Sequence, residues 1–171
     1  MFKWLGLICI VAASSGVGFG YARSIRRQSA QLGHLIDSLG YMRSEILYRM
    51  TPLPELFETL SGAENNAVGL FFSLCASQLR SDRTMPIPGI FKKSWENCRT
   101  VCLSPETKQT LLSLGMALGR FDVDGQCRAI ELAEQKLRRE QETLDKNKRA
   151  RCRGYEAIGI CAGLAAAIVI L

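Results

Sequence analysis

Hydrophobic residues recur every three or four positions through the middle of the chain, the spacing of a helix with one apolar face. The clearest stripe consists of Leu32, Leu35, Ile36, Leu39, Met42, Ile46, Leu47 and Met50. Charged residues such as Arg43, Glu45 and Arg49 fall largely outside it. The pattern predicts a long amphipathic helix. Thr51-Pro52-Leu53-Pro54 predicts its end and the start of another helix, since proline suits a first turn and disfavours helix in the residue before it.

Two short helices and a loop are predicted after this junction. The apolar positions Leu53, Leu56, Phe57 and Leu60 predict a second helix that runs out at Gly62, and residues 67–79 predict a third. Residues 81–89 contain Pro86 and Pro88 and little periodicity, which predicts a surface loop. A fourth helix is marked by Ile90, Phe91, Trp95, Cys98 and Cys102.

The last two helices are predicted from their start and stop signals. Ser104-Pro105-Glu106 offers a capping hydroxyl, a first-turn proline and an acid at the positive end of the helix dipole. That fifth helix should end at Gly119. A sixth should start at Asp122, Asp124 or Gly125 and can run straight into the C-terminal apolar run. No segment alternates with a period of two for any length. We therefore predict an all-α fold, an antiparallel bundle of about six helices.

Two long runs near the ends of the chain, residues 4–22 and 157–171, contain no charged residue. Residues 4–22 would form a helix of about 28 Å, close to the roughly 30 Å of a bilayer core, whereas residues 157–171 would give only about 22 Å. A cleaved signal peptide is the rival interpretation of the first run. We favour a retained anchor because the apolar run continues through Tyr21 and is followed by Arg23, Arg26 and Arg27.

Small residues recur at every fourth position in both runs. They are Ala12, Gly16 and Gly20 in the first run and Gly159, Gly163 and Ala167 in the second. Such stripes let helices approach closely in lipid, so the two spans are expected to pack together or against partners. The alternative is that glycine and alanine are simply common in membrane helices.

The net charge of +6 and the pI near 9.1 result largely from basic residues beside the apolar runs. These clusters are Arg23, Arg26 and Arg27, and Lys146, Lys148, Arg149, Arg151 and Arg153. Lys and Arg beside a membrane segment resist translocation, which predicts a cytoplasmic middle region. The predicted organisation is an anchor at 1–23, a cytoplasmic bundle at 24–153 and a second anchor at 154–171. Nucleic acid is not an expected partner, because no basic stripe is interleaved with aromatic residues.

The seven cysteines are odd in number and irregularly spaced, which argues against a disulfide framework. Cys98 and Cys102 could share a face of the predicted fourth helix, yet no second pair or nearby histidine completes a zinc site. We expect free thiols packed as small hydrophobic groups in a reducing compartment.

The sequence offers no recognisable active site. His34 is the only histidine, so neither a Ser-His-Asp triad nor a multi-histidine metal site can be built, and we expect it to be structural or solvent-facing. Asp122 and Asp124 are better explained as helix caps than as ligands of a divalent ion. No Gly-Lys-Ser/Thr phosphate loop is present. We expect a non-enzymatic protein without catalytic residue, metal or cofactor.

Some side chains are larger and more amphipathic than a bare bundle requires. Glu45, Tyr48, Thr51 and Pro52 gather at the first helix junction, and Trp95 is the only tryptophan outside the N-terminal run. Such residues often form contact sites. The alternative is that Tyr48 and Trp95 fill core while Glu45 caps or pairs locally.

Taken together, several strings resemble the stage III sporulation protein AB family. They are Lys3 and Gly6 with Gly18-Phe19, then Glu45-Ile46-Leu47-Tyr48 with Thr51-Pro52-Leu53, then Leu114-Gly115, Leu118-Gly119, Asp122 and Gln126, and the terminal apolar run. The resemblance covers the whole chain.

That resemblance implies a component of the mother-cell membrane around the forespore, within the channel complex that links the two cells of an endospore-forming bacterium. The family is similar to the F-type platform proteins of type II secretion and type IV pilus systems. By that analogy the bundle would dock a cytoplasmic secretion-type ATPase, and the spans would contact membrane lipid and other channel proteins, with a homo-oligomer possible.

The candidate partner-binding or junction residues are Glu45, Tyr48, Thr51, Pro52, Leu53, Trp95, Gly119, Asp122 and Gln126, and the candidate membrane-packing residues are Gly16, Gly20, Gly159 and Gly163. A second hypothesis, from another functional class, is a membrane-tethered regulatory or DNA-tethering protein that uses the basic clusters.

Overall fold

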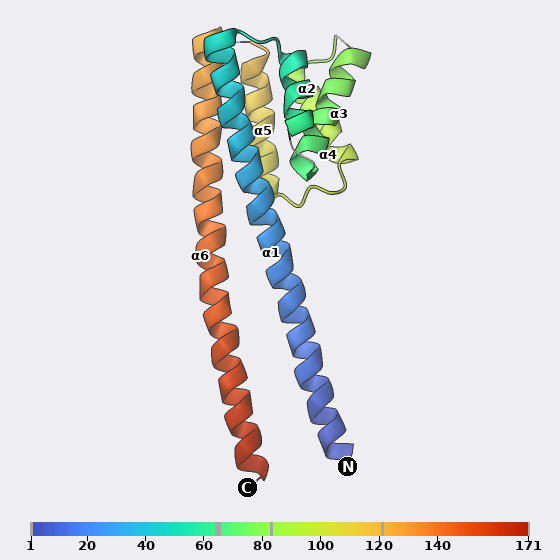
Figure 1. Ribbon diagram of the computed structural model, residues 1–171, viewed down its shortest axis with the longest axis vertical. Coiled ribbons are helices and arrows are strands. Elements are labelled where there is room, and N and C mark those ends of the chain that lie inside the picture. Colours follow the sequence, from blue (N-terminus) through green and yellow to red (C-terminus); the bar gives the residue numbers. More distant parts are fainter. Residues whose placement is uncertain (1, 64–65, 83, 121, 171) are drawn as a thin grey trace. The chain divides into compact units, whose positions relative to one another are not determined.

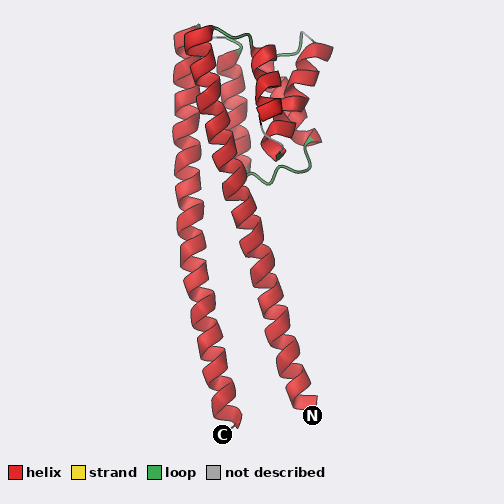
Figure 2. Ribbon diagram, viewed as in Figure 1, coloured by secondary structure: helices red, strands yellow, loops and turns green. Residues whose placement is uncertain are grey.

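The computed structural model describes residues 2–63, 66–82, 84–120 and 122–170, and it describes side chains within 24–146 apart from the same gaps. Over these residues it contains six α-helices and no strand (Figure 2). The predicted all-helical fold is confirmed.

The helices are α1 (Phe2–Arg49), α2 (Leu53–Ala63), α3 (Ala67–Ser81), α4 (Ile87–Asn97), α5 (Pro105–Leu118) and α6 (Val123–Ile170) (Figure 1). The chain divides into two compact units. The first, the terminal unit, consists of Met1–Arg27 and Glu142–Leu171, and the second, the helical unit, of Gln28–Gln141. The domain boundaries expected from the charge pattern stay predictions.

Within the helical unit, α1 and α6 pack antiparallel. The Nε2 of Gln141 donates to the carbonyl oxygen of Ser29 at 3.5 Å, and further along α1 the Nε of Arg43 lies 3.6 Å from a carboxylate oxygen of Glu134. Residues later in α1 therefore contact residues earlier in α6. The buried residues of this pair include Leu32, Leu39 and Ile46, spaced by seven along α1, and Ile130 and Leu137 on α6. The heptad spacing is that of left-handed helix packing.

Helices α2, α3 and α4 enclose an aromatic cluster. The ring of Phe57 lies 5.8 Å from those of Phe72 and Phe91, and the ring of Phe71 lies 5.3 Å from that of Phe72. All four rings are buried. Tilted and edge-on pairs of this kind contribute about 0.5–1.5 kcal/mol each beyond the burial of their area, so the cluster fixes how the three helices pack.

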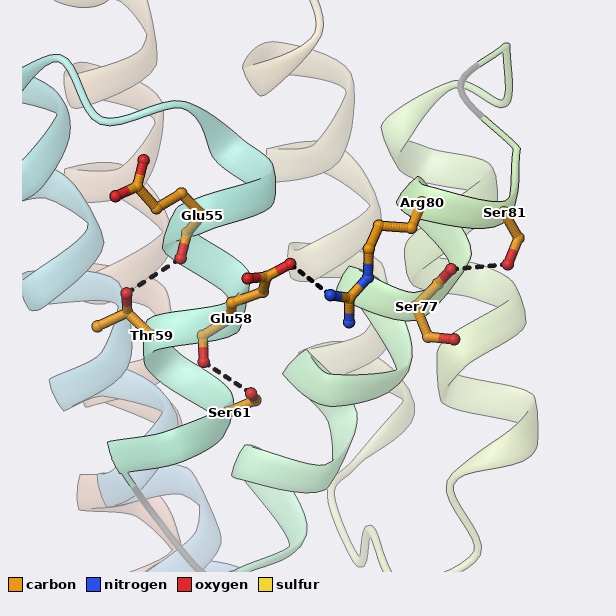
Figure 3. A network of polar contacts seen from close by, with 7 residues as sticks. All are labelled: Glu55, Glu58, Thr59, Ser61, Ser77, Arg80 and Ser81. Carbon is orange, nitrogen blue, oxygen red and sulfur yellow. Dashed lines mark hydrogen bonds and ion pairs between the residues drawn. The ribbon is translucent and has the colours of Figure 1, made fainter.

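Polar contacts at the surface add little to this packing. The Nη1 of Arg80 on α3 lies 2.8 Å from Oε1 of Glu58 on α2, and the hydroxyls of Thr59, Ser61 and Ser81 donate to carbonyl oxygens of their own helices (Figure 3). Both charged side chains are largely exposed, and solvent screens such pairs, so we expect at most about 1 kcal/mol from this ion pair.

Helix α5 starts as its sequence predicts, and α6 holds that start in place. The Oγ of Ser104 accepts from the backbone N–H of Thr107 at 3.0 Å. The carboxylate of Glu140, on α6, accepts from the hydroxyls of Ser104 at 2.6 Å and Thr107 at 2.9 Å. Negative charge at a helix N-terminus is favourable, so Glu140 stabilises α5 as well as joining two helices.

The predicted loop at 81–89 and the predicted fourth helix are both partly wrong. Helix α4 begins at Ile87, because Pro86 is extended and serves as its N-cap while Pro88 occupies the first turn, where a missing N–H costs nothing. The helix ends at Asn97, and Cys98 is its C-cap with φ −91° and ψ 83°. Cys98 and Cys102 therefore do not share a helical face.

Within the part of the chain whose side chains are described, no helix combines the length and the apolar composition needed to cross a bilayer. The predicted packing residues Gly16, Gly20, Gly159 and Gly163 lie within α1 and α6, outside the part of the chain whose side chains are described.

Candidate partner-binding corner

The chain reverses direction at the α1–α2 corner, which we define as residues 45–53. Helix α1 ends at Arg49, and Met50 has φ 52°, a left-handed conformation that is uncommon for a residue with a side chain. The backbone N–H of Thr51 then folds back to the carbonyl oxygen of Glu45 at 3.4 Å. The N–H of Leu56 donates to the carbonyl of Pro52 at 3.0 Å and opens α2.

The carboxylate of Glu45 stabilises this corner. Its Oε2 accepts from the hydroxyl of Thr51 at 2.9 Å, and its Oε1 lies 3.3 Å from Nη1 of Arg49. The Glu45 side chain is 12% exposed, so these bonds are partly shielded from water. Of the two interpretations of Glu45, local pairing is confirmed. The left-handed conformation of Met50 costs of order 1–3 kcal/mol. The bonds of Glu45 to residues on either side of Met50 offset that cost.

The apolar side chains at the tip of the corner point into solvent. Tyr48 is 79% exposed, Met50 is 74% exposed and Leu47 is 43% exposed. The expectation that Tyr48 fills core is therefore wrong. Pro52 is also exposed and Leu53 is half-buried. A backbone fixed by polar bonds thus presents three large apolar groups on its outer side.

Residues at the end of α5 and the start of α6 lie at the same end of the helical unit. The antiparallel pairing through Arg43 and Glu134 brings the first turns of α6 beside the last turns of α1 (Figure 1). Asp122 is exposed, and its Oδ1 accepts from the N–H of Gly125 at 3.1 Å, which confirms it as the cap of α6. The N–H of Gln126 donates to the carbonyl of Asp122 at 2.9 Å, and Gln126 is half-buried.

Gly119 ends α5 as predicted, although its conformation is right-handed, with φ −91° and ψ −8°. A Cβ there would meet the carbonyl oxygen of Gly115 at 3.7 Å and Ile87 at 3.9 Å, which are ordinary contacts. The backbone at this position therefore does not require glycine.

Trp95 does not belong to the corner. Its ring packs edge-on against Phe71 at a centroid distance of 6.2 Å, and it lines a small apolar cavity with residues that include Leu35 and Leu111. Because Leu35 lines the same cavity, Trp95 lies beside a part of α1 that is about 15 Å along the helix from Glu45 at 1.5 Å per residue. For Trp95 the core interpretation is supported.

The thiols occupy separate environments. Cys98 is buried and its Sγ lies 3.7 Å from the carbonyl oxygen of Ala67, whereas Cys102 is exposed. Burial raises the pKa of the Cys75 thiol to about 12. His34 is exposed on α1. Among side chains described in the structure, no three His, Cys, Asp or Glu groups are placed to hold a metal ion.

Three further residues position these elements and were not predicted. Gly115 faces α4 so closely that a Cβ would lie 3.2 Å from the backbone of Pro88. Gln31 bonds to both sides of a turn, since its Nε2 donates to the carbonyl of Thr100 at 3.0 Å and its Oε1 accepts from the N–H of Cys102 at 2.7 Å. Glu140 joins α6 to α5. A small residue in the middle of an apolar helix hinted at Gly115, whereas no local pattern marks Gln31 or Glu140.

The family of the chain is shown by its similarity to known proteins. A family model described as stage III sporulation protein AB matches residues 3–171. Stage III sporulation protein AB of Bacillus subtilis (strain 168) is 26% identical over 174 residues, an alignment that covers 100% of both chains. A solved structure of stage III sporulation protein AB covers 72% of this chain and 98% of its own, with a TM-score of 0.67 and 22% identity, which shows a shared fold. The chain therefore belongs to the stage III sporulation protein AB family.

Proposed function

We propose that this chain is a non-enzymatic membrane platform in the channel complex between mother cell and forespore that is required for endospore formation, and that its helical unit docks a cytoplasmic secretion-type ATPase. Membership of a sporulation family supports the setting. The observation that carries the docking is the exposure of Tyr48 and Met50 on a corner whose backbone is fixed by Glu45.

Membrane attachment is proposed from the sequence. The uncharged runs at 4–22 and 157–171 would both insert in the mother-cell membrane around the forespore, with the residues between them in the cytoplasm. Gly16, Gly20, Gly159 and Gly163 would then let these helices pack against each other or against other membrane proteins of the channel.

The corner has the physical properties of a binding site. Tyrosine is among the residues that dominate binding energy at interfaces, because it buries a large area with few rotatable bonds. A preformed backbone also lowers the entropy lost on association. Arg49 and Pro52, which lie close to Tyr48 in sequence, are also exposed, as is Asp122, the cap of α6.

The test measures binding of the ATPase to the full chain in neutral detergent. Tyr48→Ala and Met50→Ser should each weaken binding, Tyr48→Ala by about 30-fold or more, the size of an interface hot spot. Met116→Ala and Leu70→Ala are matched controls, because these side chains are 52% and 45% exposed on α5 and α3. Binding unchanged by both corner variants, with circular dichroism showing intact folding, would overturn the docking proposal.

A further inference from the structure

The net charge of the chain resides in one of its two units. The terminal unit, Met1–Arg27 with Glu142–Leu171, contains nine Lys and Arg residues against three Asp and Glu residues. The helical unit contains thirteen of each, so its formal charge is zero. The terminal unit therefore accounts for the full +6 of the chain.

Eight of the nine basic residues lie near the ends of the two segments that join the helical unit. They are Arg23, Arg26, Arg27, Lys146, Lys148, Arg149, Arg151 and Arg153, and we refer to them as the basic collar. The two groups are more than a hundred residues apart in sequence, yet their segments belong to one compact unit. Of the collar residues whose side chains are described, Arg26, Arg27 and Lys146 are all exposed.

The position of the collar indicates what it meets. On one side in sequence lies a neutral helical unit, and on the other lie the uncharged runs 4–22 and 157–171. A nucleic-acid site would be expected to extend over a larger basic surface, whereas charge confined next to apolar runs suits the headgroup layer of a membrane. Guanidinium groups donate paired hydrogen bonds to phosphate oxygens, and most of the collar is arginine.

We propose that the basic collar binds the phosphate headgroups of anionic phospholipids. The inference rests on the proposed membrane attachment and deepens it by naming a lipid class. The headgroups neutralise the charge that the collar concentrates, and a neutral zwitterionic lipid does so less well. Attraction of this kind is worth about fivefold in affinity for each basic side chain near the surface, and it weakens as salt shortens the Debye length.

The test uses the full chain in neutral detergent, titrated with phosphatidylglycerol or phosphatidylcholine at low and high sodium chloride concentration. Phosphatidylglycerol should bind at least about tenfold more tightly at low salt, and the preference should shrink at high salt. The triple variant Arg26→Gln, Arg27→Gln, Lys146→Gln should lose at least about tenfold of that affinity. The triple variant Lys92→Gln, Lys93→Gln, Arg99→Gln removes the same charge from exposed positions of the helical unit and should keep it.

Three outcomes would overturn the inference. These are equal affinity for the two lipids, equal loss in both triple variants, and binding of a short DNA duplex as tight as that of phosphatidylglycerol. Membrane attachment is measured separately, by extraction of the full chain from phosphatidylcholine vesicles with alkaline carbonate. Extraction of a chain that still prefers phosphatidylglycerol would refute the anchors alone, whereas retention without a lipid preference would refute the collar alone.

Discussion

The hydroxyl of Thr51 donates to the carboxylate of Glu45 across 2.9 Å, and this bond closes the corner between α1 and α2. The bond spans the left-handed residue Met50, so the polar pair holds the backbone in this uncommon conformation. Glu45 and Thr51 therefore determine the shape of the corner. In the proposed function, the exposed side chains of Tyr48 and Met50 make the contact with the partner.

This separation of roles predicts different effects on stability. Thr51→Val removes the hydroxyl and leaves a partly buried carboxylate without it, which should cost about 1–2 kcal/mol. Tyr48→Ala should change the free energy of unfolding by no more than about 0.5 kcal/mol, because the side chain is 79% exposed. Chemical denaturation of the full chain, followed by circular dichroism, compares the two. Equal destabilisation would contradict the assignment.

Gly115 within α5 and Gly119, the C-cap of that helix, should respond differently to an added methyl group. Gly115→Ala places a Cβ 3.2 Å from the backbone of Pro88 and from the ring of Phe91, so α4 must shift, at a cost of about 1–3 kcal/mol. Gly119→Ala is the matched control, since its Cβ meets only ordinary contacts and its φ is −91°. Thermal unfolding of both variants measures the difference, and tolerance of Gly115→Ala would show that the α4–α5 contact is looser than described.

Thiol reactivity should follow burial. Burial raises the pKa of the Cys75 thiol to about 12, so this group stays protonated at pH 8, and the thiolate is the species that reacts. Cys102 is exposed. Brief treatment of the folded protein with iodoacetamide should therefore label Cys102 and spare Cys75, as read site by site by mass spectrometry. Denaturation should abolish the protection, and rapid labelling of Cys75 in the folded protein would contradict its burial.

The carboxyl group of Asp82, in the turn after α3, should titrate below the ordinary range of an aspartate. The hydroxyl of Thr84 donates to Oδ1 of Asp82 at 2.6 Å and its backbone N–H at 3.0 Å, and these bonds lower the pKa of Asp82. A lowered folded-state pKa means that the contribution of the turn is present above the ordinary pKa and is lost as pH falls through the folded value. Thr84→Val should raise the pKa of Asp82 in an NMR titration, and an unchanged titration would argue against the hydroxyl as cause.

Features fixed by neighbouring residues could be predicted from the sequence, and features fixed by distant ones could not. Ser104 and Asp122 cap their helices because the groups they satisfy lie three residues on. The end of α4 escaped prediction because Cys98 is buried against the carbonyl of Ala67, 31 residues earlier. Pro86 and Pro88 led to the wrong start of α4 for another reason. Proline interrupts the interior of a helix but is also favoured in its first turn, so the residue type alone does not distinguish a loop from a helix start.

The candidate site divides along the same line. Glu45, Tyr48 and Thr51 could be grouped because they are close in sequence. Which of them faces solvent depends on how α1 packs against its neighbours, so the pattern left Tyr48 open between core and surface. Nothing local could connect Gln31 with Thr100, which is 69 residues away.

The spacing of residues between α1 and α6 has a consequence for alignment. A Cβ on Gly33 would lie 3.2 Å from the side chain of Gln141, and one on Gly40 would lie 3.8 Å from that of Glu134. Two glycines seven residues apart on α1 thus face two long side chains seven residues apart on α6. Such a repeat by itself would accept α1 displaced by one heptad. Arg43, which pairs with Glu134, has no equivalent one heptad away, where Ile36 and Met50 stand. The Arg43–Glu134 pair thus distinguishes the observed alignment of α1 with α6 from alignments displaced by seven residues.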